Sequence, residues 1–305
     1  MSTWTSDHIP DQTGRTAVVT GANAGIGYET ALALAKKGAH VVLACRSEQR
    51  GTDALRQIEA EQPAGSAELM LLDLADLDSV RTFAEAFWAK YVRLDLLINN
   101  AGVMVPPESK TAQGFELQFG VNVIGHFALT GLLMSALAEA PGSRVVTLSS
   151  LAHRQGRIDF DNLRGEKEYK PMREYMQSKL GDLIFAIELQ RRLEAAGQDT
   201  ISLGAHPGFT ATELQRHSGL WNTLVGLWSN TPAVGALPTL YAATAPDAEP
   251  GGYYGPRGVF EARGHPAPAK VMPHARDRQT AERLWAMAEE ATGVHFFHEV
   301  LAQAA

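Results

Sequence analysis

A tyrosine and a lysine one helical turn apart are the clearest candidates for chemistry in this sequence. Tyr175 and Lys179 stand at positions i and i+4 of a helical pattern, so their side chains project from one face. A cation beside a phenol favours the phenolate form. Such a tyrosine can pass a proton to or from a substrate oxygen near neutral pH. The spacing is not specific by itself, because it often arises by chance.

Two further polar positions could complete a proton-transfer site. Ser149 and Ser150 follow an apolar run that ends at Leu148, which would bring two hydroxyls to the carboxyl end of a strand. A hydroxyl there could hold a substrate oxygen beside Tyr175, or could simply cap a turn. Asn122 stands inside a long apolar pattern, and a buried amide needs partners. We expect either a water or catalytic network at Asn122 or a satisfied structural amide.

A glycine-rich turn near the N-terminus predicts a dinucleotide site. Residues 20–27 read TGANAGIG, after an apolar run and before a helical pattern. The spacing is G-x-x-x-G-x-G rather than G-x-G-x-x-G, but the physics is the same. Glycines let the backbone approach a pyrophosphate, and the helix N-terminus supplies N–H groups and a positive dipole. An ordinary β–α turn is the alternative, and the strand–turn–helix context argues against it. The residues expected to line the site are Gly21, Asn23, Gly25, Ile26 and Gly27, of which Gly27 would also allow close packing of helix on strand.

The end of the second apolar run indicates which dinucleotide is bound. It reads Ala44-Cys45-Arg46-Ser47. NAD sites usually place an acid here to hold the ribose hydroxyls, whereas an arginine suits the 2′-phosphate of NADP. We therefore expect NADP(H), with NAD(H) as the alternative. The competing interpretation of Arg46 is a solvated surface charge. Cys45 is expected to be a small strand residue rather than a reactive thiol.

The elements that must position these residues alternate along the chain. Short apolar runs alternate with helical patterns, as in a parallel sheet covered on both faces by helices. We therefore expect an α/β fold with a doubly wound parallel sheet (a Rossmann fold), and a single domain over residues 1–305. The expected strands are 15–20, 40–44, 68–72, 94–98, 144–148 and 200–205, and the expected helices are 30–37, 47–60, 79–91, 115–137 and 277–292.

Two regions interrupt this alternation, and a long tail follows it. Residues 152–170 are charged and irregular, and residues 208–232 mix Trp, Leu, Gly and Thr. Both follow the carboxyl ends of expected strands, where open α/β sheets bind ligands. The second region is expected to be either a lid over the substrate or a packed segment. Residues 251–305 form a C-terminal extension rich in Gly, Pro and His. Four apolar residues of the second region recur at helical spacing: Trp221, Leu224, Leu227 and Trp228.

Composition argues against several classes of function. The net charge of −7 is spread over both halves, unlike the basic patch of a nucleic-acid-binding protein. Cys45 is the one cysteine, which excludes a disulfide within the chain and fits a reducing compartment. We find no signal-peptide pattern and no apolar stretch of about 18 residues, so we expect no membrane span and a cytoplasmic protein. No metal is expected, because no metal-ligand spacing is present. Three histidines are expected to pack or to support neighbours rather than to catalyse: His126, His153 and His206.

Taken together, these motifs resemble the short-chain dehydrogenase/reductase family. The resemblance covers about two-thirds of the chain, from the first expected strand to past the sixth. It is carried by TGANAGIG, Asp73-Leu74, Asn99-Asn100-Ala101-Gly102, Asn122, Ser150, Tyr175-x-x-x-Lys179 and Pro207-Gly208. A closer likeness is to the retinol dehydrogenase branch, which includes WW-domain oxidoreductase relatives. That likeness lies in NVIGHFALT, VTLSSLAH, IDFDNLRGEK, the SKL after Tyr175 and the long gap between Ser150 and Tyr175.

The resemblance implies a role for each matching residue. Tyr175 would be the acid/base, Ser150 would hold the substrate oxygen, and Lys179 would favour the phenolate and bind the nicotinamide ribose. Asn122 would position a proton-relay water. The other matching residues would surround the cofactor: Asp73 and Leu74 beside the adenine, Asn99, Asn100, Ala101 and Gly102 supporting sheet and cofactor, and Pro207, Gly208 and Thr210 against the nicotinamide.

The expected function is hydride transfer between NADP(H) and an alcohol/carbonyl pair, on a small and partly hydrophobic substrate. Two alternatives stay open. One is a catalytically silent nucleotide-sensing or scaffold protein on the same fold, and the other is a reductase of an activated carbon–carbon double bond. The resemblance also implies pairing of two chains through the helices that carry Asn122 and Tyr175, although residues 152–170 and the tail could cover that surface.

Overall fold

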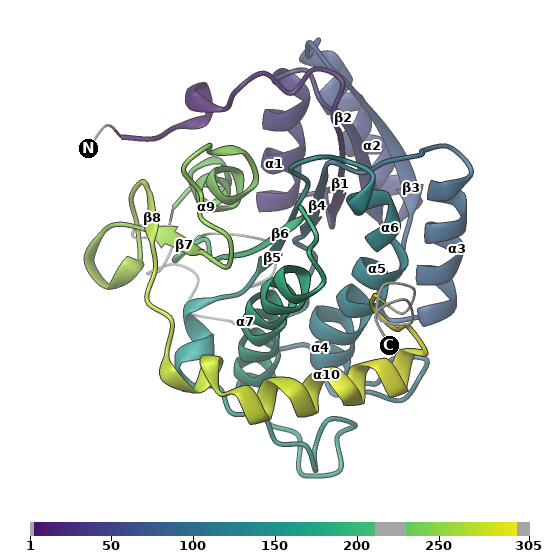
Figure 1. Cartoon of the computed structure of the whole chain (residues 1–305), viewed down its shortest axis with the longest axis vertical. Helices are drawn as coiled ribbons and strands as arrows, with labels where there is room; N and C mark the ends of the chain where they lie inside the picture. The colour runs from purple at the N-terminus through teal and green to yellow at the C-terminus, as the bar shows by residue number, and fades with distance from the viewer. Residues whose placement is uncertain (1–2, 211–229, 298–305) are drawn as a thin grey trace.

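An eight-stranded sheet forms the centre of the computed structural model, which describes residues 3–210 and 230–297 (Figure 1). The strand order is β3-β2-β1-β4-β5-β6-β7-β8, and neighbours are parallel except for β7 and β8. The order reverses between β1 and β4, which is the switch point where open α/β sheets bind ligands. The strands are β1 (Thr16–Thr20), β2 (His40–Cys45), β3 (Ser66–Leu71), β4 (Leu96–Asn99), β5 (Arg144–Leu148), β6 (Ile201–Ala205), β7 (Tyr253–Pro256) and β8 (Pro266–Pro268).

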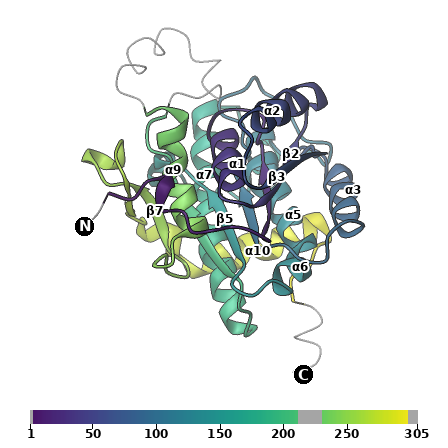
Figure 2. The same ribbon diagram turned by 90° about the horizontal axis from the view of Figure 1, so that it is seen from above.

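Helices cover both faces of the sheet, because successive residues of a strand point to opposite faces. Val18 belongs to an apolar core with α3, α5, α7 and α10, and Val19 belongs to a second core with α1, α2 and α9. Figure 2 shows this arrangement from above. The α-helices are α1 (Gly25–Lys36), α2 (Glu48–Ala60), α3 (Leu77–Trp88), α4 (Leu117–Phe119), α5 (His126–Leu132), α6 (Met134–Ala138), α7 (Pro171–Ala195), α9 (Pro232–Thr244) and α10 (Arg278–Thr292). The other helical turns are η1 (Ser6–His8), η2 (Gly120–Gly125), η3 (Leu151–Gln155), η5 (Val259–Glu261) and η6 (Pro273–Arg276).

The doubly wound fold predicted from the sequence is confirmed. All six expected strands form, with ends displaced by two residues at most. The first helix begins at Gly25 rather than at residue 30, because the glycine turn continues directly into it. Strands β7 and β8 and helix α9 were not expected. The two strands are too short to show an alternating pattern, and α9 contains Pro238, which usually interrupts a helix.

The prediction of one continuous helix over residues 115–137 is wrong. The segment consists of α4, the π-helical turn η2, α5 and α6. Glycines allow close contacts on both sides of the π turn. A Cβ at Gly120 would lie 2.2 Å from Thr111 Cγ2, and one at Gly125 would lie 2.5 Å from the Leu74 carbonyl oxygen. The π turn places Asn122 beside the loop that follows β4, where its side chain bonds to Val103.

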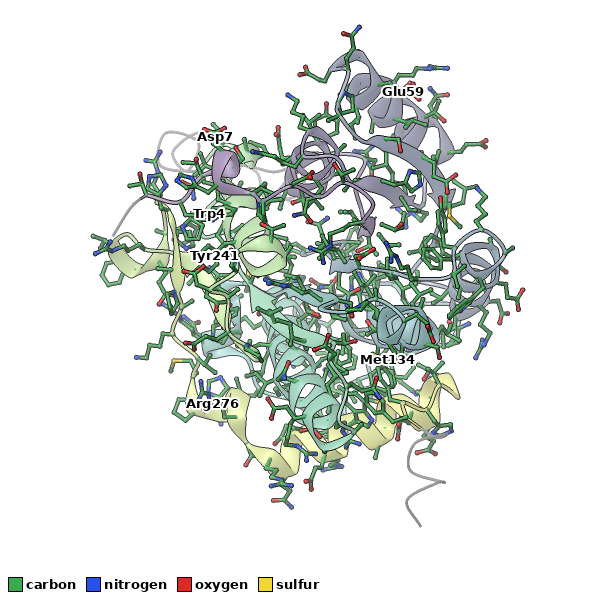
Figure 3. All side chains as sticks on the ribbon, turned by 45° about the horizontal axis from the view of Figure 1, so that its top comes forward. Trp4, Asp7, Glu59, Met134, Tyr241 and Arg276 are labelled. Atoms are coloured by element: carbon green, nitrogen blue, oxygen red, sulfur yellow. The ribbon has the colours of Figure 1, made fainter. Side chains whose placement is uncertain are left out.

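The two ends of the described chain pack onto opposite helical layers. The N-terminal segment lies against α9, where the rings of Trp4 and Tyr241 meet edge to face at 5.4 Å (Figure 3). Helix α10 crosses α7, as Figure 1 shows. Among the described helices, none has the length and apolar character needed to cross a bilayer. The four apolar residues at helical spacing lie outside the described residues: Trp221, Leu224, Leu227 and Trp228.

Candidate active site

The carboxyl ends of four strands bring four segments of the chain to one edge of the sheet. The glycine loop follows β1, and residues 99–102 end and follow β4. Ser149 and Ser150 follow β5, and residues 206–208 follow β6. Because parallel strands end at the same edge, segments far apart in the sequence meet there. This edge therefore contains most of the site residues predicted from the sequence.

Tyr175 and Lys179 lie one turn apart within the first three turns of α7 and face the same side. The Lys179 ammonium is 6.0 Å from the centroid of the Tyr175 ring, and the tyrosine is 9% exposed. Pro171 occupies the first turn, where its missing N–H leaves no helical hydrogen bond unmade. The helix thus presents the phenol and the cation together at the edge of the sheet.

Lys179 is buried and held by two acceptors. Its Nζ donates to the Leu148 carbonyl oxygen at 3.0 Å and to Asp182 Oδ2 at 2.7 Å. Burial disfavours the ammonium, but the negative charge of Asp182 and the nearby Tyr175 oxygen outweigh it, so the pKa of Lys179 is raised. The lysine is therefore an ammonium at neutral pH.

The two serines after β5 have different partners. Ser149 Oγ is buried and donates to the Lys179 carbonyl oxygen at 2.6 Å, which uses its proton within α7. Ser150 Oγ accepts from the Ala152 N–H at 3.2 Å as the cap of η3, so its own O–H stays available. The loop after η3 presses on α7, since a Cβ at Gly156 would lie 2.4 Å from the Met176 carbonyl oxygen. The geometry therefore favours Ser150 over Ser149 as the hydroxyl for a ligand.

Asn122 is fully buried in the π turn, and its side chain is satisfied. Its Oδ1 accepts from the Val103 N–H at 2.9 Å, and its Nδ2 donates to the Val103 carbonyl oxygen at 3.1 Å and to Ser178 Oγ at 2.9 Å. Of the two expectations for this residue, the amide matches the structural one. Asn122 thus connects α7 to the segment after β4 through hydrogen bonds. Gly102 lies beside it in that segment, where a Cβ would be 3.2 Å from Asn122 Oδ1 and 3.6 Å from Lys179 Nζ.

A buried histidine connects the π turn to the ends of β1 and β4. His126 Nδ1 donates to the Asn122 carbonyl oxygen at 2.8 Å, and Nε2 lies 2.9 Å from Thr20 Oγ1. The same threonine oxygen accepts from the N–H groups of Asn100 and Ala101, both at 2.9 Å. Burial lowers the pKa of His126 to about 4, so the ring is neutral at neutral pH. The expectation that His126 supports its neighbours is confirmed.

The glycine loop has the close backbone approach that its sequence predicts. Gly21 and Gly25 have φ values of +66° and +57°, in the left-handed region that glycine adopts readily. A Cβ at Gly27 would lie 2.5 Å from the Gly21 carbonyl oxygen and 2.4 Å from Asn100 Nδ2. The amide of Asn100 in turn donates to the Thr20 carbonyl oxygen at 2.7 Å. At the N-terminus of α1, which includes buried Ile26, no side chain of the described residues caps the first N–H groups.

Two arginines lie near the end of β2. Arg46 directly follows the strand, is exposed, and makes no ion pair with any residue of the described chain. Arg50 lies one turn into α2. In the orientation of the Asn23 amide that satisfies both of its polar atoms, Asn23 Oδ1 accepts from Arg50 Nε at 3.3 Å and from Nη2 at 3.2 Å. Cys45 is buried, and burial raises its pKa to about 11, as expected for an unreactive strand residue.

The remaining predicted cofactor residues shape loops at the same edge. Asp73 Oδ1 accepts from the Ala75 N–H at 2.9 Å, which forms a tight turn after β3, and Leu74 is buried below it. Gly208 has a φ of +68°, and its N–H donates to His206 Nδ1 at 3.2 Å. The Pro207 carbonyl oxygen accepts from buried Thr210 Oγ1 at 3.0 Å.

Sequence reasoning missed two residues beside this site. Asp182 stands three positions after Lys179, a spacing that predicts contact on a helix, but it was not considered. Arg50 stands four positions after Arg46 in the following helix and was also overlooked. Both could have been found from charge spacing alone. No group of residues suited to hold a metal ion occurs within 3–210 and 230–297.

Comparison with known sequences gives close matches over nearly the whole chain. The profile of the family described as short chain dehydrogenase matches residues 15–223. Polyprenol dehydrogenase of Mus musculus is 44% identical over 296 residues, covering 93% of this chain and 86% of the relative. Retinol dehydrogenase 12 of Bos taurus is 42% identical over 288 residues, covering 93% of this chain and 88% of the relative.

Comparison with solved structures agrees. An uncharacterised protein from Mycobacterium paratuberculosis has a TM-score of 0.82 and 41% sequence identity, and the match covers 97% of this chain and 99% of that one. A short chain dehydrogenase from Shigella flexneri, solved in complex with NADP, has a TM-score of 0.64 and 25% identity. The match covers 79% of this chain and 96% of that one.

Proposed function

This chain belongs to the short chain dehydrogenase family, whose members are NAD(P)-dependent oxidoreductases of alcohols and carbonyls, and we propose that it works with NADP(H) through Ser150, Tyr175 and Lys179. The observation that carries the proposal is the arrangement on α7. A buried ammonium lies 6.0 Å from the centroid of the Tyr175 ring, at the sheet edge where the glycine loop also ends. The retinol dehydrogenase likeness inferred from the sequence is confirmed by the relatives.

The residues at this edge fit a dinucleotide. A Cβ at Gly27 would collide with Gly21 and Asn100, so glycine is what allows the loop, the start of α1 and the segment after β4 to pack closely at this edge. The free N–H groups of α1 suit a pyrophosphate. The bound nicotinamide would supply or accept the hydride, and the protein supplies orientation and the proton.

The proton step follows from the partners of the three residues. In the direction of reduction, Tyr175 donates its phenolic proton to the oxygen of the carbonyl as that oxygen becomes an alcohol. The positive charge of Lys179 stabilises the phenolate that remains. Ser150 has an O–H to donate, because its Oγ accepts from the Ala152 N–H and donates to no acceptor among the described residues. In the direction of oxidation the same groups act in reverse.

The choice of NADP(H) over NAD(H) rests on charge at the end of β2. Arg46 is exposed there without an ion-pair partner in the described chain, and Arg50 lies beside Asn23 of the glycine loop. The guanidinium of Arg46 could bind a 2′-phosphate at the end of β2, where an NAD site usually has a carboxylate. The NADP complex of the Shigella flexneri relative supports the same choice.

We propose a partly hydrophobic alcohol or carbonyl as the substrate. Relatives named polyprenol dehydrogenase and retinol dehydrogenase act on lipophilic alcohols, as their names say. Phe209 directly follows the Pro207-Gly208 segment and is 52% exposed at the site edge. The same proposal includes Asp73 beside the adenine, Gly102 as part of the segment that supports the cofactor, and Thr210 against the nicotinamide.

A carbonyl panel with NADPH tests the function. Purified chain is mixed with NADPH and aldehydes or ketones of increasing chain length, and NADPH oxidation is followed by absorbance. We expect turnover that improves with apolar length, and a kcat for Tyr175→Phe that is lower by about 100- to 10,000-fold, as expected for loss of a general acid. NADPH affinity, measured by fluorescence, should be nearly unchanged in that variant.

Three outcomes would contradict the proposal. Cofactor binding with no turnover of any compound would favour the silent nucleotide-sensing protein. Product analysis that shows a reduced carbon–carbon double bond would favour the alternative reductase. Full activity of Tyr175→Phe would exclude the proton-transfer role of this residue.

A further inference from the structure

Helix α7 carries a second buried charge, Asp182, one turn beyond Lys179. Its side chain is 2% exposed and that of Lys179 is 8% exposed. Asp182 Oδ2 accepts from Lys179 Nζ at 2.7 Å, while Asp182 Oδ1 has no hydrogen-bond partner among the residues that the structure describes. Burying a carboxylate with one oxygen unpaired lowers the stability of the fold. Such a group therefore suggests a role other than stability. The fold alone gives no reason for it, since an apolar residue could fill the same place on the helix.

The carboxylate limits where the lysine can point. An ammonium has three N–H donors, and two of them are used by Asp182 and by the Leu148 carbonyl oxygen at the end of β5. The nitrogen is held beside Gly102, where a Cβ would lie 3.6 Å from Nζ. These two bonds leave one N–H unused, and Nζ lies 6.0 Å from the centroid of the Tyr175 ring. Asp182 thus fixes both the position and the direction of the cation.

We propose that Asp182 is a positioning residue of this enzyme, which holds Lys179 as a correctly directed ammonium and thereby sets the upper pH limit of carbonyl reduction. The inference rests on the proposed roles of Tyr175 and Lys179. Asp182 itself touches neither of the reacting atoms in the proposed mechanism, so it acts through the lysine.

The charges around Asp182 determine the direction of the effect. The titratable groups that face the pair are Tyr175 on α7, His126 on α5 and Tyr253 on β7. Burial lowers the pKa of His126 to about 4 and raises that of Tyr253, so both stay neutral over the working range. Burial also raises the pKa of Asp182 to about 6 despite the attraction of Lys179, so Asp182 is a carboxylate above that pH.

Reduction needs a proton on Tyr175 and a positive charge on Lys179. The negative charge of Asp182 helps to raise the pKa of Lys179, so its removal makes the lysine proton easier to lose. The alkaline limb of the reduction profile, where the charge of Lys179 is lost, should then move to lower pH.

The test compares the pH dependence of kcat for Asp182→Asn with that of the wild type, with NADPH and the best carbonyl of the panel. We expect the alkaline limb to move down by about 1–2 pH units, the size of shift that a charge at this distance produces. Asp95→Asn is the matched control. Asp95 is also a buried carboxylate, but it binds Arg15 and the Thr16 N–H at the opposite edge of the sheet. Its alkaline limb should coincide with that of the wild type.

An Asp182→Asn enzyme with lower kcat but the wild-type alkaline limb would overturn the inference, because a merely structural residue lowers activity at every pH alike. Tyr175→Phe is measured in parallel. If that variant keeps full turnover, the proposed function fails. If Tyr175→Phe is inactive and Asp182→Asn keeps the wild-type alkaline limb, only the present inference fails.

Thermal unfolding gives a second measurement that needs no activity. Lys179→Met leaves the carboxylate buried without its partner and should lower Tm. Adding Asp182→Asn to that variant removes the unpaired charge, so the double variant should unfold at a higher temperature than Lys179→Met alone. A double variant that is no more stable than Lys179→Met would overturn the pairing.

Discussion

At the scale of single residues, cofactor preference depends on Arg46 in the proposed function. A charge-assisted hydrogen bond to a phosphate is worth about 1.5–3 kcal/mol, which corresponds to about a 10- to 100-fold change in affinity. We therefore expect Arg46→Ala to raise KM for NADPH by about that factor. KM for NADH should change little, because NADH has no 2′-phosphate. Steady-state kinetics with each cofactor at a saturating carbonyl concentration measures both effects.

A matched control separates this effect from a general loss of positive charge. Arg56 is also an exposed arginine of this region, but it lies further along α2 and pairs with Asp53 at 3.4 Å. Arg56→Ala should leave both KM values unchanged. A wild-type enzyme that prefers NADH, or an Arg46→Ala enzyme with unchanged KM for NADPH, would contradict the assignment.

At the scale of elements, one glutamate joins three segments behind the site. Glu261 Oε2 accepts from His206 Nε2 at 3.0 Å and pairs with Arg154 of η3 at 2.6 Å, and Oε1 accepts from the Lys270 N–H at 3.0 Å. The His206 ring accepts at Nδ1 from Gly208, so its proton lies on Nε2 and points at the carboxylate. Burial disfavours the charge of Glu261, but these partners outweigh it and lower its pKa to about 2.

This pKa predicts a pH-dependent contribution to stability. The folded-state value lies below that of an unfolded glutamate, so the stabilisation is complete above about pH 4.5 and is lost as the pH falls toward 2. Glu261→Gln should lower Tm at pH 7 by about 2–4 °C, since solvent screening limits the loss to about 1 kcal/mol. The difference in Tm between Glu261→Gln and the wild type should become smaller between pH 4.5 and pH 3, and calorimetry measures it.

The exposed pair of Glu282 with Arg278 provides the control for that measurement. Glu282→Gln should change Tm little at either pH, because exposed ion pairs contribute little. If the loss of Tm in Glu261→Gln is the same at pH 3 and pH 7, the carboxylate charge of Glu261 is not what stabilises its contacts.

The elements also show what the sequence could predict and what it could not. Strands such as β2 and β5 are mostly apolar, and Tyr175 and Lys179 stand at helical spacing, so the local pattern was sufficient to predict the strands and the pair. The π turn was missed because the close approach of its two glycines to Thr111 and Leu74 cannot be recognised from a local pattern. The bond from Thr20 to His126 spans 106 positions, and that from His206 to Glu261 spans 55. Such partners become visible only when the sheet is assembled.

At the scale of the whole molecule, α10 covers the surface of α5 and α7 that the family resemblance predicts for pairing of chains. Trp285 is 3% exposed, and its ring centroid lies 5.0 Å from that of Phe127 and 5.9 Å from that of Phe185. Arg192 of α7 stacks over the same indole at 4.3 Å. The buried residues of α10 recur every three or four positions, as in an amphipathic helix with its apolar face inward.

We expect the whole chain to be monomeric, because α10 already buries the face through which two copies would pair. Trp285→Ala should lower the free energy of unfolding by about 3–5 kcal/mol, the usual loss for a large aromatic core residue. It should also produce concentration-dependent association, since it loosens the helix that shields Phe127 and Phe185. Light scattering after size-exclusion chromatography measures the mass, and denaturant titration measures the stability.

Trp88→Ala is the control, because Trp88 is 40% exposed and its loss should change neither the mass nor the stability strongly. A stable dimer of the wild-type chain, unaffected by Trp285→Ala, would show that pairing uses another surface and that α10 serves only the core.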